Sequence, residues 1–205
     1  MELQYIKKII LEYHDFIQNI ELKRRYFPIE VLANYVIIGP RRAGKTYYLY
    51  QLIQEFCEGG NSIEDIVFLN FEDERFMEFR HQDFDSILQA YRELFDTKPI
   101  LFFDEIHIVA GWEKFVRRLA DTGYRVYVSG SNAQMLSHDI ATTLGGRFMV
   151  KEILPLSFGE YLAFQNFTFI KQDLLRDSKV ALIKRFYHRF FYSGAFPETL
   201  LFAQS

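Results

Sequence analysis

The stretch that decides the fold is GPRRAGKT, residues 39–46. It follows the apolar run Tyr35-Val36-Ile37-Ile38 and precedes a helix-compatible segment, residues 47–56. This order of strand, loop and helix is the context that the phosphate-binding pattern G-x-x-x-x-G-K-[ST] requires. Its glycines let the backbone turn N–H groups inward, and the following helix adds the positive end of its dipole. The stretch therefore predicts a phosphate-binding loop.

Individual residues of this loop have separate predicted roles. Lys45 is expected to reach the β- and γ-phosphates, and the Thr46 hydroxyl is expected to hold Mg²⁺. The side chains of Arg41 and Arg42 are expected to point away from the phosphates, because such a loop binds through its backbone. The residues predicted to bind the nucleotide are Gly39, Pro40, Arg41, Arg42, Ala43, Gly44, Lys45, Thr46 and Tyr47.

A second apolar run, residues 100–103, is followed at once by Asp104 and Glu105. Hydrolysis needs a metal-binding carboxylate and a group that activates water. We expect Asp104 to bind Mg²⁺ through its water shell and Glu105 to polarise the attacking water. A rival run, residues 68–74, also ends in acids, but Asn70 interrupts it. Asn70 is either a polar residue that holds the catalytic glutamate until a partner engages or a strand-end cap.

Two later positions are candidates for contacting the γ-phosphate. The segment Val128-Ser129-Gly130-Ser131-Asn132 ends another predicted strand, and Ser131 is the first choice there, ahead of Ser129 and Asn132. A helix N-cap is the alternative role for this serine. Arg147 opens the next strand and is predicted to be an arginine finger that neutralises charge on the transferring phosphate. The alternative is an ordinary surface arginine.

Apolar runs and helix-compatible segments alternate along the chain, which favours an α/β three-layer sandwich around a parallel sheet. Residues 1–26 read as a helix with a heptad-like apolar stripe that packs on the domain or on another chain. We divide the sequence into an N-terminal helix (1–28), an ATPase core (29–156) and a helical lid segment (157–205). Strands are expected at 35–39, 66–69, 100–103, 125–129 and 148–153, and helices at 45–57, 83–96, 112–121, 133–139, 157–166 and 171–192.

Composition limits the class of protein. The 205 residues are 49% hydrophobic and carry a net charge of −3, which argues against a chain that is basic throughout and binds nucleic acid through its overall charge. A single cysteine excludes an internal disulfide framework. No early run resembles a signal peptide, and no stretch is apolar for long enough to span a membrane. We therefore expect a cytoplasmic protein.

The motifs together resemble one family. GPRRAGKT, LFFDEIH, VYVSGSN, GGRF, PLSFGEYL and GAFPE are similar to motifs of the AAA-superfamily ATPases of bacteria and archaea that usually carry an uncharacterised C-terminal domain. The resemblance covers about residues 30–200 and implies a five-stranded parallel sheet of order 5-1-4-3-2. It also implies ATP with Mg²⁺ and an Arg147 that acts in its own subunit or, more typically, from a neighbouring subunit of a homo-oligomer. Chains of this family are commonly longer, so we expect a short member or a fragment with an incomplete lid.

Four functions are candidates for these residues. A small-molecule kinase is the least favoured, because the sequence shows no arginine-rich lid near the phosphates. The first is ATP binding and Mg²⁺-dependent hydrolysis by a molecular switch, with Lys45, Glu105, Ser131 and Arg147 as the catalytic set and a protein or DNA partner. The second is a helicase or nucleic-acid-stimulated translocase, because Asp104-Glu105-Ile106-His107 resembles a D-E-x-H box. In the first reading, His107 is a capping or packing residue. The third is a nucleotide-dependent scaffold without catalysis.

Overall fold

The computed structural model describes residues 2–131 and 142–197. The chain forms two compact units. The first comprises Met1–Gly39 and Lys45–Glu152, and the second comprises Pro40–Gly44 and Ile153–Ser205. In the described residues, no helix is both long and apolar enough to cross a membrane.

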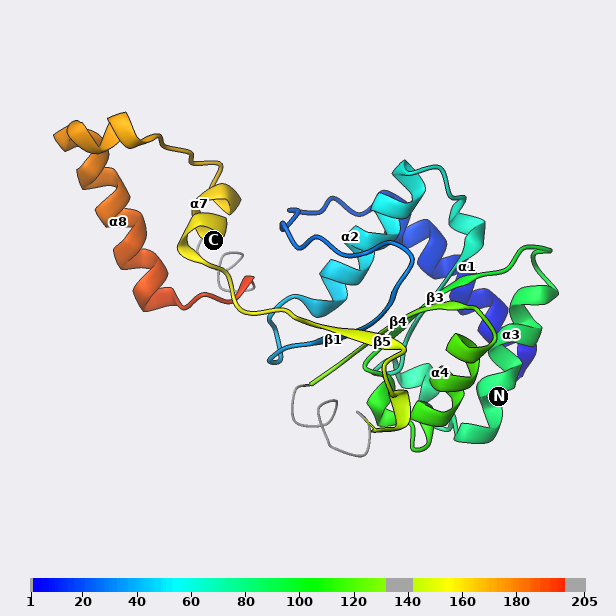
Figure 1. The fold of residues 1–205 in the computed structure, drawn as a ribbon. Helices are drawn as coiled ribbons and strands as arrows, with labels where there is room; N and C mark the ends of the chain where they lie inside the picture. The colour runs from blue at the N-terminus through cyan, green and yellow to red at the C-terminus, as the bar shows by residue number, and fades with distance from the viewer. Residues whose placement is uncertain (1, 132–141, 198–205) are drawn as a thin grey trace. The chain divides into compact units, whose positions relative to one another are not determined.

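A parallel five-stranded sheet organises the first unit (Figure 1). Its strand order is β2-β3-β4-β1-β5, which confirms the predicted order 5-1-4-3-2. The strands are β1 (Asn34–Ile38), β2 (Ile66–Asn70), β3 (Ile100–Asp104), β4 (Arg125–Gly130) and β5 (Phe148–Glu152). The described α-helices of this unit include α1 (Leu3–Asn19), α2 (Lys45–Glu58), α3 (Phe84–Arg92) and α4 (Trp112–Asp121). The predicted helix at 133–139 lies outside the described residues.

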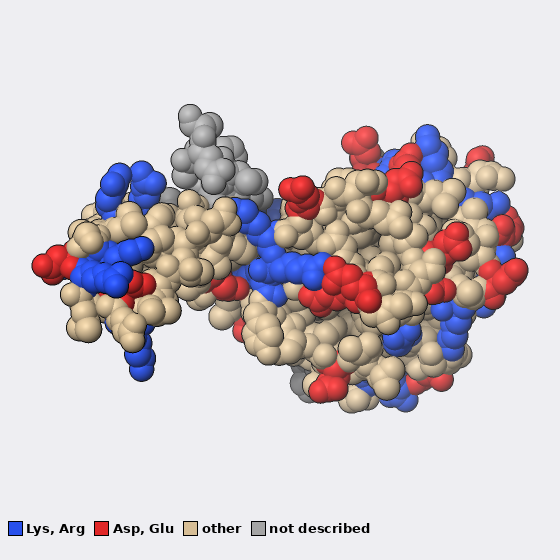
Figure 2. All heavy atoms as spheres, turned by 90° about the horizontal axis from the view of Figure 1, so that it is seen from above, with Lys and Arg blue, Asp and Glu red and all other residues tan. Residues whose placement is uncertain are grey.

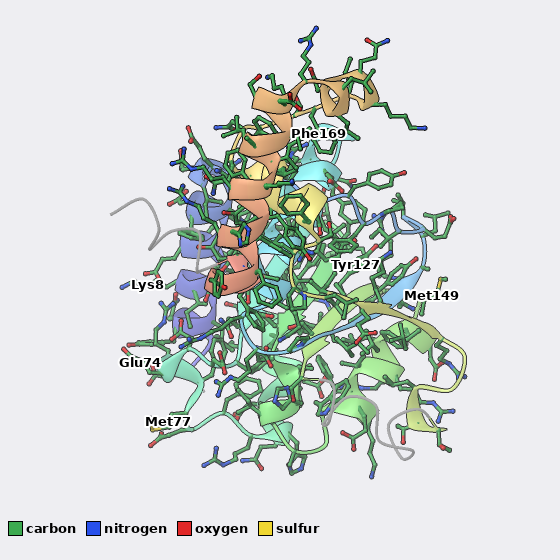
Figure 3. All side chains as sticks on the ribbon, turned by 90° about the vertical axis from the view of Figure 1, so that its left-hand side faces the viewer. Lys8, Glu74, Met77, Tyr127, Met149 and Phe169 are labelled. Atoms are coloured by element: carbon green, nitrogen blue, oxygen red, sulfur yellow. The ribbon has the colours of Figure 1, made fainter. Side chains whose placement is uncertain are left out.

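Helices cover both faces of this sheet, as the continuous apolar runs of its strands require. On one face, Phe56 of α2 packs against Phe102 and Tyr127, with ring centroids 6.1 and 5.7 Å apart. On the other face, Phe115 of α4 lies 5.9 Å from Phe103. Neighbouring residues of β3 thus point to opposite layers. Tyr127 is buried in the centre of the unit, and Met149 of the outer strand β5 is 50% exposed (both labelled in Figure 3).

Helix α1 is shorter than the sequence pattern predicts. Its apolar stripe, including Ile6, Ile9 and Ile10, is fully buried against β2 and α3 of the same chain. The helix ends at Asn19 rather than near residue 26. Gln54 of α2 accounts for this end, because its amide donates to the carbonyl oxygens of Ile17 and Ile20 at 2.9 and 3.0 Å. These hydrogen bonds satisfy the two carbonyl groups, which would otherwise accept from N–H groups of a further helical turn.

The second unit contains two described α-helices, α7 (Phe158–Phe164) and α8 (Asp177–Ser193), with a 3₁₀ turn, η5 (Lys171–Leu175), between them. Ser157 and Glu160 form a capping box that starts α7. Aromatic side chains of the two helices pack around Tyr161, whose ring lies 5.3 Å from that of Phe190. The single helix predicted at 171–192 is therefore a 3₁₀ turn followed by a helix.

Candidate nucleotide site

The predicted phosphate loop begins at the carboxyl end of β1 and leads directly into α2. Lys45 is the first residue of α2, and its Nζ atom donates to the carbonyl oxygen of Gly39 at 3.3 Å. The bond joins the two ends of the loop. Within the loop, Arg42 and Gly44 have positive φ angles of 65° and 96°. The value at Gly44 lies outside the range that a side chain tolerates well, which explains the glycine there.

Asp104 ends β3 at the same edge of the sheet and is fully buried. Its Oδ2 atom accepts a hydrogen bond from the Thr46 hydroxyl at 2.7 Å, and its Oδ1 atom accepts one from the Ser129 hydroxyl. Sequence analysis ranks Ser131 above Ser129, yet Ser129 is the serine that contacts the acid. Strand alternation could have identified it, because Tyr127 and Ser129 share a face of the sheet with Phe102 and Asp104.

Burial raises the pKa of Asp104 to about 6, although the hydrogen bonds from Ser129 and Thr46 act in the opposite direction. The ordinary value is 3.8. Between these two values the folded chain keeps a proton that the unfolded chain has released. The free energy of unfolding therefore falls as pH rises through this window and stays lower above it.

We expect Asp104→Asn to remove this loss of stability. Relative to the variant, the parent chain should lose about 2 kcal/mol between pH 4 and pH 7, from 1.36 kcal/mol per pKa unit for the part of the shift that lies above pH 4. Urea unfolding across this pH range, without metal or nucleotide, measures the difference. Asp96→Asn, which changes an exposed aspartate, should retain the parent's pH dependence. Parallel stability curves for the parent and Asp104→Asn would contradict the raised pKa.

Glu105 adopts a left-handed backbone conformation, with φ 50° and ψ 36°, between β3 and the 3₁₀ turn η4 (Ile106–Ile108). Such a conformation in a residue other than glycine costs about 1–2 kcal/mol and is found preferentially at functional sites. The backbone N–H of Glu105 donates to the Ser129 hydroxyl at 3.1 Å. Its Oε1 atom lies 3.1 Å from Lys45 Nζ, and its Oε2 atom lies 3.3 Å from His107 Nδ1.

Lys45 and Glu105 are both largely buried, with side chains 4% and 12% exposed. Their ion pair is therefore weakly screened by solvent. Each of the four carboxylate oxygens of Asp104 and Glu105 has a protein partner. The lysine and the hydroxyl that the loop pattern assigns to phosphate and Mg²⁺ are thus held by the two acids.

The remaining predicted residues have other partners, although Asn70 stands beside Asp104 in the register of β2 and β3. Asn70 caps the turn after β2, because its Oδ1 atom accepts from the backbone N–H of Glu72 at 2.9 Å. Arg147 forms an ion pair with Asp121 at the end of α4. Ser131 follows β4 and is partly exposed, and Asn132 lies outside the described residues.

Several basic groups of the first unit form ion pairs with acidic ones. Figure 2 shows the two signs interspersed over the face that it draws of this unit. Arg24 pairs with Glu58, and Arg118 pairs with Asp85. A hollow of about 670 Å³ near the amino ends of β3 and β4 is lined by several cations, among them Lys98. Lys98 already donates to the Thr122 carbonyl at 2.9 Å. These contacts do not favour a nucleic-acid surface.

Comparison with known proteins identifies the family. The model of a family described as an AAA domain matches residues 33–162. The chain belongs to this family. The matched range includes the loop at residues 39–46 and the acids Asp104 and Glu105.

Two curated relatives are uncharacterised. Protein MJ1544 of Methanocaldococcus jannaschii is 38% identical over 197 residues, which are 95% of this chain and 43% of the relative. A protein of Haemophilus influenzae is 33% identical over 168 residues, which are 81% of this chain and 40% of the relative. The chain thus spans less than half the length of either relative.

Solved structures support the fold. The Hsp104–casein complex of Saccharomyces cerevisiae in its extended conformation matches 95% of this chain and 35% of its own, with 16% identity and a TM-score of 0.52. The Hsp104–ADP complex of the same organism matches 95% of this chain and 29% of its own, also with 16% identity and a TM-score of 0.52.

Proposed function

We propose that this chain binds ATP and hydrolyses it with Mg²⁺, as a molecular switch of the AAA type. The observation that supports this most is the convergence of Lys45 and Thr46 with Asp104 and Glu105 at one edge of the sheet. The two pairs are separated by 58 residues in the sequence, yet Thr46 Oγ1 lies 2.7 Å from Asp104 Oδ2. Phosphate binding and water activation need these residue types together.

The donor set fits Mg²⁺. A threonine hydroxyl and a carboxylate are hard oxygen ligands, and Mg²⁺ usually adds waters and substrate phosphates to one or two such protein groups. Thr46 would bind directly and Asp104 through water. When bound, Mg²⁺ neutralises charge on the β- and γ-phosphates. The raised pKa of Asp104 fits this role, because a nearby cation would stabilise its charged form.

The remaining residues have distinct proposed tasks. Lys45 leaves Glu105 and pairs with the phosphates, which the loop backbone also binds. Glu105 then orients and polarises the attacking water. Ser129 holds both acids in position through its hydroxyl, and Ser131 senses the γ-phosphate. The helical segment from residue 157 onward serves as a lid that transmits the nucleotide state to a partner.

Arg147 is proposed to act on the site of a neighbouring subunit. Its contact with Asp121 leaves the Arg147 side chain 39% exposed. Loss of an arginine finger lowers kcat by about 10³-fold or more. We therefore expect Arg147→Ala and Glu105→Gln each to be inactive, and a mixture of the two to recover ATP hydrolysis.

Arg117→Ala is the matched control for this mixing experiment, because Arg117 also pairs with Asp121, at 3.7 Å. It should remain active by itself. A mixture that stays as inactive as its components would rule out action between subunits.

The direct test of the proposed function is phosphate release from ATP. We expect release that requires Mg²⁺ and that single- or double-stranded DNA leaves unchanged. A several-fold stimulation by DNA would favour the translocase alternative. ATP binding without release above background would favour the scaffold alternative, in which nucleotide only orders an interface.

A further inference from the structure

His107 follows the catalytic acid by two residues and lies back against it. The 3₁₀ turn η4 produces this arrangement, since the N–H of Ile108 donates to the carbonyl of Glu105 at 3.2 Å. Ile106 is fully buried and anchors the turn against the core. The His107 side chain is only 13% exposed, and its Nδ1 atom lies 3.3 Å from Glu105 Oε2. The contact is close but does not have the geometry of a hydrogen bond, and the buried Nδ1 atom makes no hydrogen bond within the described part of the chain in this arrangement.

The two oxygens of the Glu105 carboxylate have different partners. Oε1 contacts Lys45 and Oε2 contacts His107. On the proposed function, ATP binding breaks the contact with Lys45 and leaves the contact with His107, because Lys45 must pair with phosphate when ATP binds. Glu105 then loses the contact at Oε1 at the stage when its orientation matters most. The contact at Oε2 involves no residue of the phosphate loop.

We propose that His107 is a positioning residue that holds the Glu105 carboxylate in its catalytic orientation once Lys45 has moved to the phosphates. The inference rests on the proposed function and adds a residue to it. When Oε1 is released, an imidazole with a proton on Nδ1 moves closer to Oε2 and donates a hydrogen bond to it. Catalytic hydrogen bonds shorten in the same way when substrate is bound. The bond to Oε2 restricts rotation of the carboxylate and keeps the other oxygen directed at water.

A pair of substitutions isolates the Nδ1 donor. His107→Asn keeps an amide donor near the Nδ1 position, and His107→Leu has a similar branched shape without a donor. We expect His107→Leu to lower kcat for ATP by about 10- to 100-fold, the lower part of the range for a lost acid–base contribution. His107→Asn should stay within about threefold of the parent by the same scale. Neither variant should change the Kd for ATP appreciably, because His107 does not contact the nucleotide.

A double-variant cycle shows whether the effect acts through Glu105. In a Glu105→Gln background, His107→Leu should cause no further loss of kcat, because the group that it positions is already absent. His81→Ala, an exposed histidine away from the site, is the control and should behave as the parent. Thermal unfolding checks that each variant is folded, and His107→Ala replaces His107→Leu if the latter is not.

Three results would overturn the inference. They are a normal kcat in folded His107→Leu, an equal loss of kcat in the Leu and Asn variants, or a full further loss in the Glu105→Gln background. Any of these, in a chain that hydrolyses ATP, would leave the proposed ATPase intact. Absence of hydrolysis by the parent would instead count against the ATPase itself, so the two failures are distinguishable.

Discussion

Glu105→Gln is expected to lower kcat for ATP hydrolysis by about 10²- to 10⁴-fold, the range for loss of a general base. The same substitution is expected to tighten ATP binding. Glu105 lies 3.1 Å from the Lys45 ammonium, which on the proposed function pairs with the phosphates of ATP. A neutral amide competes for this ammonium less well than a carboxylate does, and it also repels the γ-phosphate less. We expect the Kd for ATP to fall by roughly tenfold, or about 1.4 kcal/mol.

Phosphate release and equilibrium binding of a fluorescent ATP analogue measure these two effects separately. The matched control is Glu72→Gln, which changes an acid of the rival run after β2. It should leave both kcat and the Kd for ATP near the parent values. Turnover at the parent rate by Glu105→Gln would show that another group activates the water. Inactivation by Glu72→Gln would point to the rival acids.

The combination of a lower kcat with a lower Kd for ATP also separates the functional alternatives. A scaffold that turns over slowly for incidental reasons would show tighter binding without a fall in kcat. A simple loss of folding would weaken binding together with kcat. A lower kcat together with tighter ATP binding in Glu105→Gln is expected only if Glu105 both activates water and competes with ATP for Lys45.

The strands and the pairing of the two motifs could be predicted from the sequence because their signals are local. The apolar run at 100–103 specifies a strand buried on both faces, and Asp104 and Glu105 follow it directly. Parallel strands place their carboxyl ends at one edge, so acids after β3 must lie near the loop after β1. This part of the prediction does not depend on knowing which side chains from distant parts of the sequence are in contact.

Other features depend on contacts that a local pattern does not contain. Helix α1 ends at Asn19 because Gln54, more than 30 residues later, satisfies its last carbonyls. The choice between Ser129 and Ser131 depends on which face of β4 meets Asp104. Asn70 caps Glu72 in this structure, and its predicted role as a switch stays a prediction. His107 reads as a packing residue until the turn at Glu105 brings its ring back to the carboxylate.

Lys45→Ala is expected to abolish ATP binding at concentrations up to at least 100 times the parent Kd, a loss of about 2.7 kcal/mol or more. Lys45 is the one lysine of the loop at residues 39–46. Its side chain is buried, and its ammonium group donates to the carbonyl oxygen of Gly39. Without it, phosphate charge is left uncompensated in a site that solvent screens weakly. Equilibrium binding of labelled ATP measures the loss. Lys114→Ala, an exposed lysine of α4, is the control and should bind ATP normally.

Loss of binding could also follow from loss of folding, and the structure provides a way to separate them. Removing one partner of a buried ion pair leaves the other charge uncompensated, at a cost of about 3–5 kcal/mol. Lys45→Ala should therefore unfold at lower temperature than the parent, because Glu105 remains charged and largely buried. Adding Glu105→Gln removes that charge, so the double variant should regain much of the lost thermal stability and still fail to bind ATP. A double variant that binds ATP as the parent does would show that Lys45 acts through the fold and does not contact the phosphates.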